Sequence, residues 1–250
     1  MNKIMALIAT ETRMLLRNRT IAVTAIVVPL GMGLFFIWNL GSYGDAPQLL
    51  ATAIALQLAI VAGMSVYTTA TLILVARRHS GVLKRMRTSG VSDAGLLVAT
   101  IAPGVLVGLI QLLLFIPFDA VIAGPTVVDP LPLVLAGLGG LLLAVAAALA
   151  TTIVTATPER AQITTLPLVF VILGAAIAAV VVPSEGWWQA LIALPGAAIG
   201  QLTEFALVGG TWSAGLGGLP AALPAVAALV VWPVLFAALA RRGFRWDVRR

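Results

Sequence analysis

The residue types that build most catalytic and metal sites are scarce in this sequence. It contains no cysteine and a single histidine, His79. Zinc and haem sites need several Cys or His ligands, and a thiol nucleophile needs a cysteine beside a base. Both classes of chemistry are therefore excluded. We expect no metal and no cofactor to be held by this chain.

The main charged groups are basic, and their densest interior cluster spans residues 77–87. Its members are Arg77, Arg78, Lys84, Arg85 and Arg87. Val82, Leu83 and Met86 share one face of a helical turn, and Gly90 is a favourable helix stop. The pattern predicts a short amphipathic helix over 81–88. Such a helix suits either anionic lipid or a cleft on a soluble partner, and the residues leave both open.

A second basic amphipathic segment covers residues 1–20. Its basic residues are Lys3, Arg13, Arg17 and Arg19. Ile4, Leu7 and Leu15 lie on the opposite side of a helical wheel, which predicts a helix in a membrane interface. Glu11 falls within the apolar face, where a bare carboxylate is costly, so we expect it to pair with an arginine of 77–87. The alternative is a basic anchor that only sets orientation.

The elements that position these clusters must be membrane helices. The sequence is 61% hydrophobic and 10% charged, whereas soluble domains are about 25% charged. A span needs about 20 apolar residues. The predicted spans are 21–40, 48–76, 94–116, 131–156, 163–182 and 221–240, with a cytoplasmic loop at 77–93, an outer segment at 183–220 and a tail at 241–250.

The distribution of charge favours six spans over seven. Residues 189–210 are apolar enough for a seventh, but only six spans place all 15 Lys and Arg on one side, as the positive-inside rule requires. The prediction is a single all-α transmembrane domain over 1–250 in the plasma membrane, with both termini cytoplasmic. Residues 189–210 then form re-entrant outer helices, and Asp119 lies in the turn after the third span.

Polar side chains within the spans are the candidates for a substrate pathway. These are Gln57, Thr68, Thr69 and Gln111. Ser and Thr more often bond to their own or a neighbouring helix, so a purely structural role is the alternative.

The 77–90 loop resembles a known family. Its order, Arg-Arg-x-x-Gly-x-Leu-Lys-Arg-x-Arg-x-Ser-Gly, is similar to the first cytoplasmic loop of type-2 ABC exporter permeases, the class that contains the daunorubicin-resistance permeases. The match lies at Arg77, Arg78, Gly81, Leu83, Lys84, Arg85 and Arg87. The chain departs from the family pattern at His79 and Ser80, where acidic residues are usual.

The resemblance implies a permease subunit that exports a hydrophobic or amphipathic compound as a homodimer or sibling heterodimer. It implies that residues 1–20, with Glu11, Arg13, Arg17 and Arg19, form a connecting helix. It further implies that Gly81, Val82, Leu83, Lys84, Arg85, Met86 and Arg87 form a coupling helix that docks on a soluble ABC ATPase. ATP and Mg²⁺ would bind that partner, because the two lysines, Lys3 and Lys84, lie outside any G-x-x-x-x-G-K-[ST] phosphate loop.

Two other classes compete with this interpretation. An ion-coupled secondary transporter usually carries an ionisable residue near the bilayer midplane, and we expect none there. A non-transporting membrane scaffold is the second alternative. A membrane enzyme is disfavoured, because the sequence offers no acid–base or nucleophile set.

Overall fold

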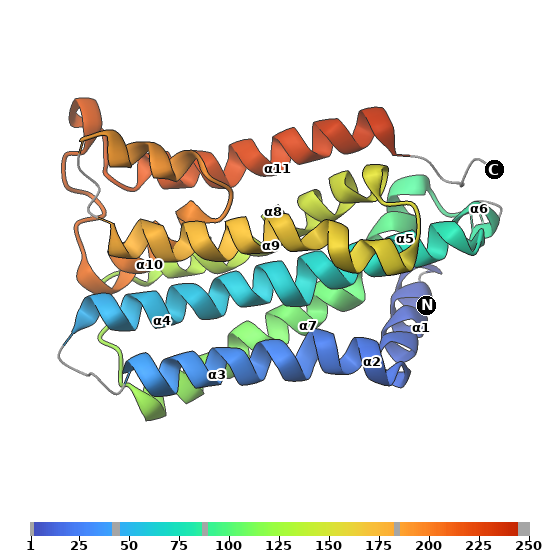
Figure 1. The fold of residues 1–250 in the computed structure, drawn as a ribbon, viewed down its shortest axis with the longest axis horizontal. Coiled ribbons are helices and arrows are strands. Elements are labelled where there is room, and N and C mark those ends of the chain that lie inside the picture. Colours follow the sequence, from blue (N-terminus) through green and yellow to red (C-terminus); the bar gives the residue numbers. More distant parts are fainter. Residues whose placement is uncertain (1–2, 42–45, 87–89, 183–185, 245–250) are drawn as a thin grey trace.

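A computed structural model describes residues 3–41, 46–86, 90–182 and 186–244, and these ranges fold mainly into helices (Figure 1). In chain order the elements are α1 (Lys3–Arg17), α2 (Arg19–Ala22), the π-helical η1 (Val23–Val27), α3 (Val28–Gly41), α4 (Pro47–Ile60), the π-helical η2 (Val61–Thr68), α5 (Thr69–His79), α6 (Val82–Met86), α7 (Asp93–Ile122), α8 (Pro130–Val154), α9 (Pro158–Val181), the 3₁₀-helical η4 (Gly186–Ala193), α10 (Ala197–Val208), the 3₁₀-helical η5 (Leu216–Gly218) and α11 (Leu223–Gly243). The predicted all-α class is confirmed for these residues.

Five helical stretches within the described ranges are long and apolar enough to cross a membrane. They are Pro47–His79, Asp93–Ile122, Pro130–Val154, Pro158–Val181 and Leu223–Gly243. The first predicted span corresponds to α2, η1 and α3, whose apolar part, Ala25–Asn39, is shorter. The structure thus gives five of the six expected spans by length and composition, and the count of six stays a prediction.

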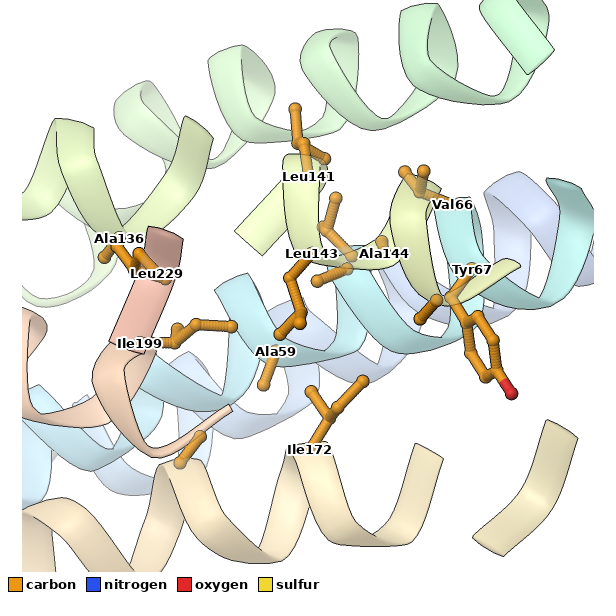
Figure 2. Close-up of a cluster of buried hydrophobic side chains, with 14 of the residues drawn as sticks. Ala59, Val66, Tyr67, Ala136, Leu141, Leu143, Ala144, Ile172, Ile199 and Leu229 are labelled. Carbon is orange, nitrogen blue, oxygen red and sulfur yellow. The ribbon is translucent and has the colours of Figure 1, made fainter. Parts of the chain in front are cut away.

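The rod formed by α4, η2 and α5 is the centre of the bundle. It is the most enclosed of the five long stretches, and it contacts α3, α7, α8, α9 and α10. Its small residues, such as Ala59, allow neighbouring backbones to approach closely. Figure 2 shows Ala59, Val66 and Tyr67 of this rod beside Leu143 of α8 and Ile172 of α9 in the main apolar core.

Basic side chains gather at one end of the bundle, which we call the basic end. Figure 1 shows that α1, the end of α5, α6, the α8–α9 turn and the end of α11 lie there. Its arginines are Arg13, Arg17, Arg19, Arg77, Arg78, Arg85, Arg160, Arg241 and Arg242. This segregation agrees with the expected distribution of positive charge. Which side of the membrane the basic end faces stays a prediction.

Two short helices, η4 and α10, fill the other end of the bundle between α9 and α11 (Figure 1). The α10 helix packs against α4, α8 and α9. Gly196 and Gly200 bring it against the α9 backbone, because a Cβ at Gly200 would lie 2.0 Å from the carbonyl oxygen of Ala176. The predicted pair of short helices is therefore present, and its depth in the membrane stays a prediction.

Candidate functional site

The N-terminal helix α1 packs on the start of α7 at the basic end. Ile4 lies over Gly95, where a Cβ would be 3.2 Å from the Ile4 Cδ1 atom. Leu15 and Glu11 are buried, at 3% and 6% exposure. The helix therefore uses its apolar face to hold one carboxylate against the bundle.

An ion pair joins α1 to the end of the central rod. The Arg77 guanidinium donates to a Glu11 carboxylate oxygen at 2.6 Å. The pairing expected for Glu11 is thus confirmed. The side chain of Arg77 is 22% exposed and that of Glu11 7%, so water screens this pair less than a surface salt bridge.

The neighbouring arginine, Arg78, points to a different helix. It is 7% exposed, and its guanidinium donates to the backbone carbonyl of Thr152 at 2.6 Å and to that of Thr155. The last carbonyls of a helix lack intrahelical partners and carry the negative end of the macrodipole. Arg78 therefore caps the C-terminus of α8.

The predicted coupling segment forms the short helix α6 directly after this arginine pair. Gly81, with φ of +69°, makes the turn that α6 follows. Leu83 is fully buried and Arg85 is exposed. Val82 is half-buried. The helix thus turns an apolar side chain inward and a basic one outward.

Three members of the predicted coupling segment are described in part or not at all. Lys84 and Met86 belong to α6 by their backbone. Arg87 lies outside the described residues. The docking role of all seven residues, Gly81 to Arg87, stays a prediction.

The arginines of the predicted connecting helix are exposed. Arg13 and Arg17 project from α1, and Arg19 begins α2. Of the four residues expected to act in this segment, Glu11 is the one that the structure brings to the 77–87 cluster. A groove of about 330 Å³ opens beside the pair, between α1 and α5, and is lined by Leu72, Ile73 and Asn18 among others.

The predicted pathway residue Gln57 is buried and tied to two neighbouring helices. Its side-chain nitrogen donates to Asp119 Oδ1 of α7 at 2.8 Å and to the Gly33 carbonyl of α3 at 3.2 Å. The Gln57 Oε1 atom is buried without a hydrogen-bond partner. In this conformation Gln57 therefore links α3, α4 and α7.

Gln111 of α7 is likewise buried and hydrogen-bonded to neighbouring helices. It is 1% exposed, and its Nε2 donates to the carbonyls of Ala25 and Ile26 at 3.1 Å each. Its Oε1 accepts from Ser65 at 2.6 Å. These bonds satisfy two carbonyl oxygens of the π-helical η1, and backbone groups freed from the regular helical pattern in a membrane need such partners.

The two threonines of the predicted pathway lie on the central rod. Thr68 is half-buried and donates to the Gly63 carbonyl of the same rod at 2.9 Å. Thr69 is buried and its methyl group lies beside Gly104 of α7. Lining a substrate pathway stays a prediction for all four residues, Gln57, Thr68, Thr69 and Gln111.

The placement of Asp119 in a turn is wrong. The α7 helix continues through Pro117 to Ile122, so Asp119 lies within its last turns, 8% exposed. From sequence alone, an apolar span is predicted to end at its first carboxylate. Here the helix continues past Asp119, because the carboxylate accepts a hydrogen bond from the Gln57 amide. The chain therefore does carry a buried acidic residue within a long apolar helix.

The Gln57–Asp119 bond gives a test of this network. Gln57→Leu leaves the Asp119 carboxyl buried without its donor, and we expect a loss of about 1–3 kcal/mol in stability. Thermal unfolding of the detergent-solubilised protein measures the loss. The exposed Gln162→Leu on α9 is the matched control, and equal melting temperatures for the two variants would contradict the assignment.

Sequence reasoning missed the different roles of Arg77 and Arg78. It placed both in one basic cluster, 77–87, although successive residues on a helix point about 100° apart. That rotation was the available signal, since it sends one arginine toward α1 and the other toward α8. The carbonyl partners of Arg78 carry no signal, because every residue has a backbone carbonyl.

Comparison with known families gives a match over most of the chain. The family model described as ABC-2 family transporter protein matches residues 36–242, most of the 250-residue chain. The match begins within α3, so it includes α6 and both arginines and excludes α1. No curated protein and no solved structure matches the chain.

The permease of this family is a transport subunit, not itself catalytic, and an ABC ATPase subunit pairs with it. The chain thus belongs to the ABC-2 transporter family and is the multi-pass membrane component of an ABC transporter.

Proposed function

We propose that this chain is the permease subunit of an ATP-driven exporter in the cell membrane, with both termini in the cytoplasm. Two permease copies, or this chain and a sibling, work with two soluble ATPase subunits that bind ATP and Mg²⁺. The cargo is a hydrophobic or amphipathic compound, such as a drug, an antibiotic or a lipid. The likeness of the 77–90 loop to daunorubicin-resistance permeases supports the export direction.

The observation that carries this proposal is the arrangement of the basic end. The short helix α6 follows an arginine pair that holds α1 on one side and α8 on the other. Arg85 projects outward from α6, where an acidic cleft of an ATPase would meet it. The α6 helix is then the docking element. Its attachment to α1 and α8 would transmit a movement of the ATPase to the bundle.

The enclosed character of the bundle supports an apolar cargo. The central core consists of small and aliphatic side chains. The polar side chains of Gln57, Ser65 and Gln111 bond to neighbouring helices. A cargo that passes along such helices meets few fixed charges, which favours hydrophobic or amphipathic compounds.

Buried Asp119 favours a second candidate, an ion-coupled transporter, because an ionisable residue inside a membrane helix often marks an ion pathway. Transport in cells whose proton gradient is collapsed while ATP is maintained separates the two. Export by an ATP-driven system continues under these conditions, and loss of transport would support the ion-coupled candidate.

The test of the docking role is co-purification with the ATPase from host membranes in mild detergent. We expect Arg85→Glu to reduce the ATPase recovered about tenfold, a loss of roughly 1.4 kcal/mol in binding. The melting temperature of the permease should not change. Arg160→Glu, an equal charge reversal at an exposed site of the basic end, is the control. Unchanged recovery with Arg85→Glu would remove α6 from the interface.

Leu83 is a poor site for that test. Its side chain is fully buried, so a carboxylate there would damage the permease itself. Loss of ATPase binding in Leu83→Asp would not separate docking from folding.

A further inference from the structure

Arg78 is a buried cation whose two hydrogen bonds both end on backbone carbonyls at the C-terminal end of α8, those of Thr152 and of the cap residue Thr155. Its Nε atom is also buried and has no hydrogen-bond partner. Removing an arginine from water is costly unless its donors are satisfied. Here the negative end of the α8 macrodipole and its unpaired terminal carbonyls supply the compensation. A role in docking alone does not require this burial.

The position of Arg78 in the chain links α8 to the docking segment. Arg78 lies three residues before Gly81, at the end of the central rod, and α6 follows at once. A displacement of α6 therefore acts directly on the Arg78 backbone. The guanidinium transmits this displacement to α8, because two hydrogen bonds from one planar guanidinium resist rotation better than a single bond.

The α8 helix is suited to carry such a displacement across the membrane. Prolines interrupt α7, α9 and α11, at Pro103, Pro117, Pro167 and Pro233. The prolines of α8 lie in its first turn, and its 25 residues extend about 37 Å without a proline kink. It is the stiffest of these four helices by this criterion.

Away from the basic end, α8 packs tightly against α10 and α11. A Cβ at Gly139 would lie 2.5 Å from Leu229 of α11, and one at Gly140 would lie 3.1 Å from Ile199 of α10. Close packing of this kind transmits a shift because it leaves no free space to absorb it. The α8 helix thus connects the basic end with α10.

We propose that Arg78 is a positioning residue that couples the docking segment to α8, so that α8 carries the motion of α6 to α10. This inference rests on the proposed function. Arg77 and Glu11 hold the same segment to α1, and Arg78 attaches it to α8, which extends toward the opposite end.

The absence of native cysteine permits a direct test by spin labelling. Labels at Ser80→Cys and Val154→Cys, both exposed positions, report the separation between the docking segment and the end of α8. The distance is measured by electron paramagnetic resonance in the permease–ATPase complex, without nucleotide and with ATP trapped by vanadate. With Arg78 present, we expect the two distributions to coincide, because both segments move together.

In Arg78→Gln the same pair should separate on trapping by about 2 Å or more, the size of helix shifts at moving interfaces. ATPase recovery and ATP hydrolysis should stay within about twofold of the unaltered complex, about 0.4 kcal/mol. Arg78→Lys should give a smaller separation, since it keeps the charge and loses the fork. Arg160→Gln removes an exposed arginine nearby and should behave like the unaltered chain.

Two results would overturn the coupling role. One is an 80–154 distance that stays fixed on trapping in Arg78→Gln. The other is an 80–154 distance that shifts as much in the chain with Arg78 as it does in Arg78→Gln. Should Arg78→Gln fail to fold, Arg78→Lys decides by the same measurement. If no ATPase co-purifies with the unaltered chain, the proposed function fails first and the coupling role fails with it. That outcome is visible before any variant is compared.

Discussion

Gly200→Ala is expected to destabilise the protein by about 3 kcal/mol or more, because overpacking that cannot be relieved by a side-chain shift exceeds the usual 1–3 kcal/mol. The new Cβ would lie 2.0 Å from the Ala176 carbonyl oxygen and 2.8 Å from its carbon. Both are backbone atoms of α9, so α10 must move away as a unit. Thermal unfolding in detergent measures the loss.

Gly174→Ala on α9 is the matched control, since nothing lies within 4 Å of its added Cβ. Alanine is the better helix former by about 1 kcal/mol, so this variant should be neutral or slightly stabilised. Equal melting temperatures for the two variants would show that α10 does not pack on α9 as described.

Arg77→Glu is expected to be a strongly destabilising charge reversal at the basic end. It places a second carboxylate against Glu11 in a partly buried site, and breaking such a pair costs about 3 kcal/mol. We expect a lower melting temperature and release of α1 from the bundle. Trypsin that cuts more rapidly at Arg17 and Arg19, where α1 meets α2, reports this release.

The charge swap Glu11→Arg with Arg77→Glu restores an attractive pair and should recover more than half of the lost stability. This non-additivity is the signature of a direct contact. Arg242→Glu reverses an exposed arginine at the same end and should change the melting temperature little, because exposed charges contribute about 1 kcal/mol or less. A swap no more stable than Arg77→Glu alone would rule out the pair.

Features that depend on local sequence pattern were predictable. Long apolar runs gave helices whose bounds differ from expectation mostly by a few residues, as between 131–156 and Pro130–Val154. The amphipathic start predicted α1, and the misplaced charge of Glu11 predicted an arginine partner from the 77–87 cluster. Both inferences need only helical periodicity and the cost of a carboxylate on an apolar face.

Features that depend on which helices meet were not predictable. The guanidinium of Arg78 and the amide nitrogen of Gln111 both donate to backbone carbonyls. The partners of Gln57 include Asp119, which lies 62 residues away in the chain. Arginine and glutamine side chains would equally suit a docking loop or a substrate pathway. Only the packing of the helices decides which carbonyl or carboxyl each one reaches.

The sequence by itself therefore determined the class of protein, since the scarcity of charged residues excludes a soluble fold. The clustering of its basic residues also predicted that they gather at one end of the helix bundle. Tertiary structure decided what each polar group does. It placed Asp119 inside α7 and separated the roles of Arg77 and Arg78. The physical reason is that buried polar groups must be satisfied, and the available partners are set by helices distant in sequence.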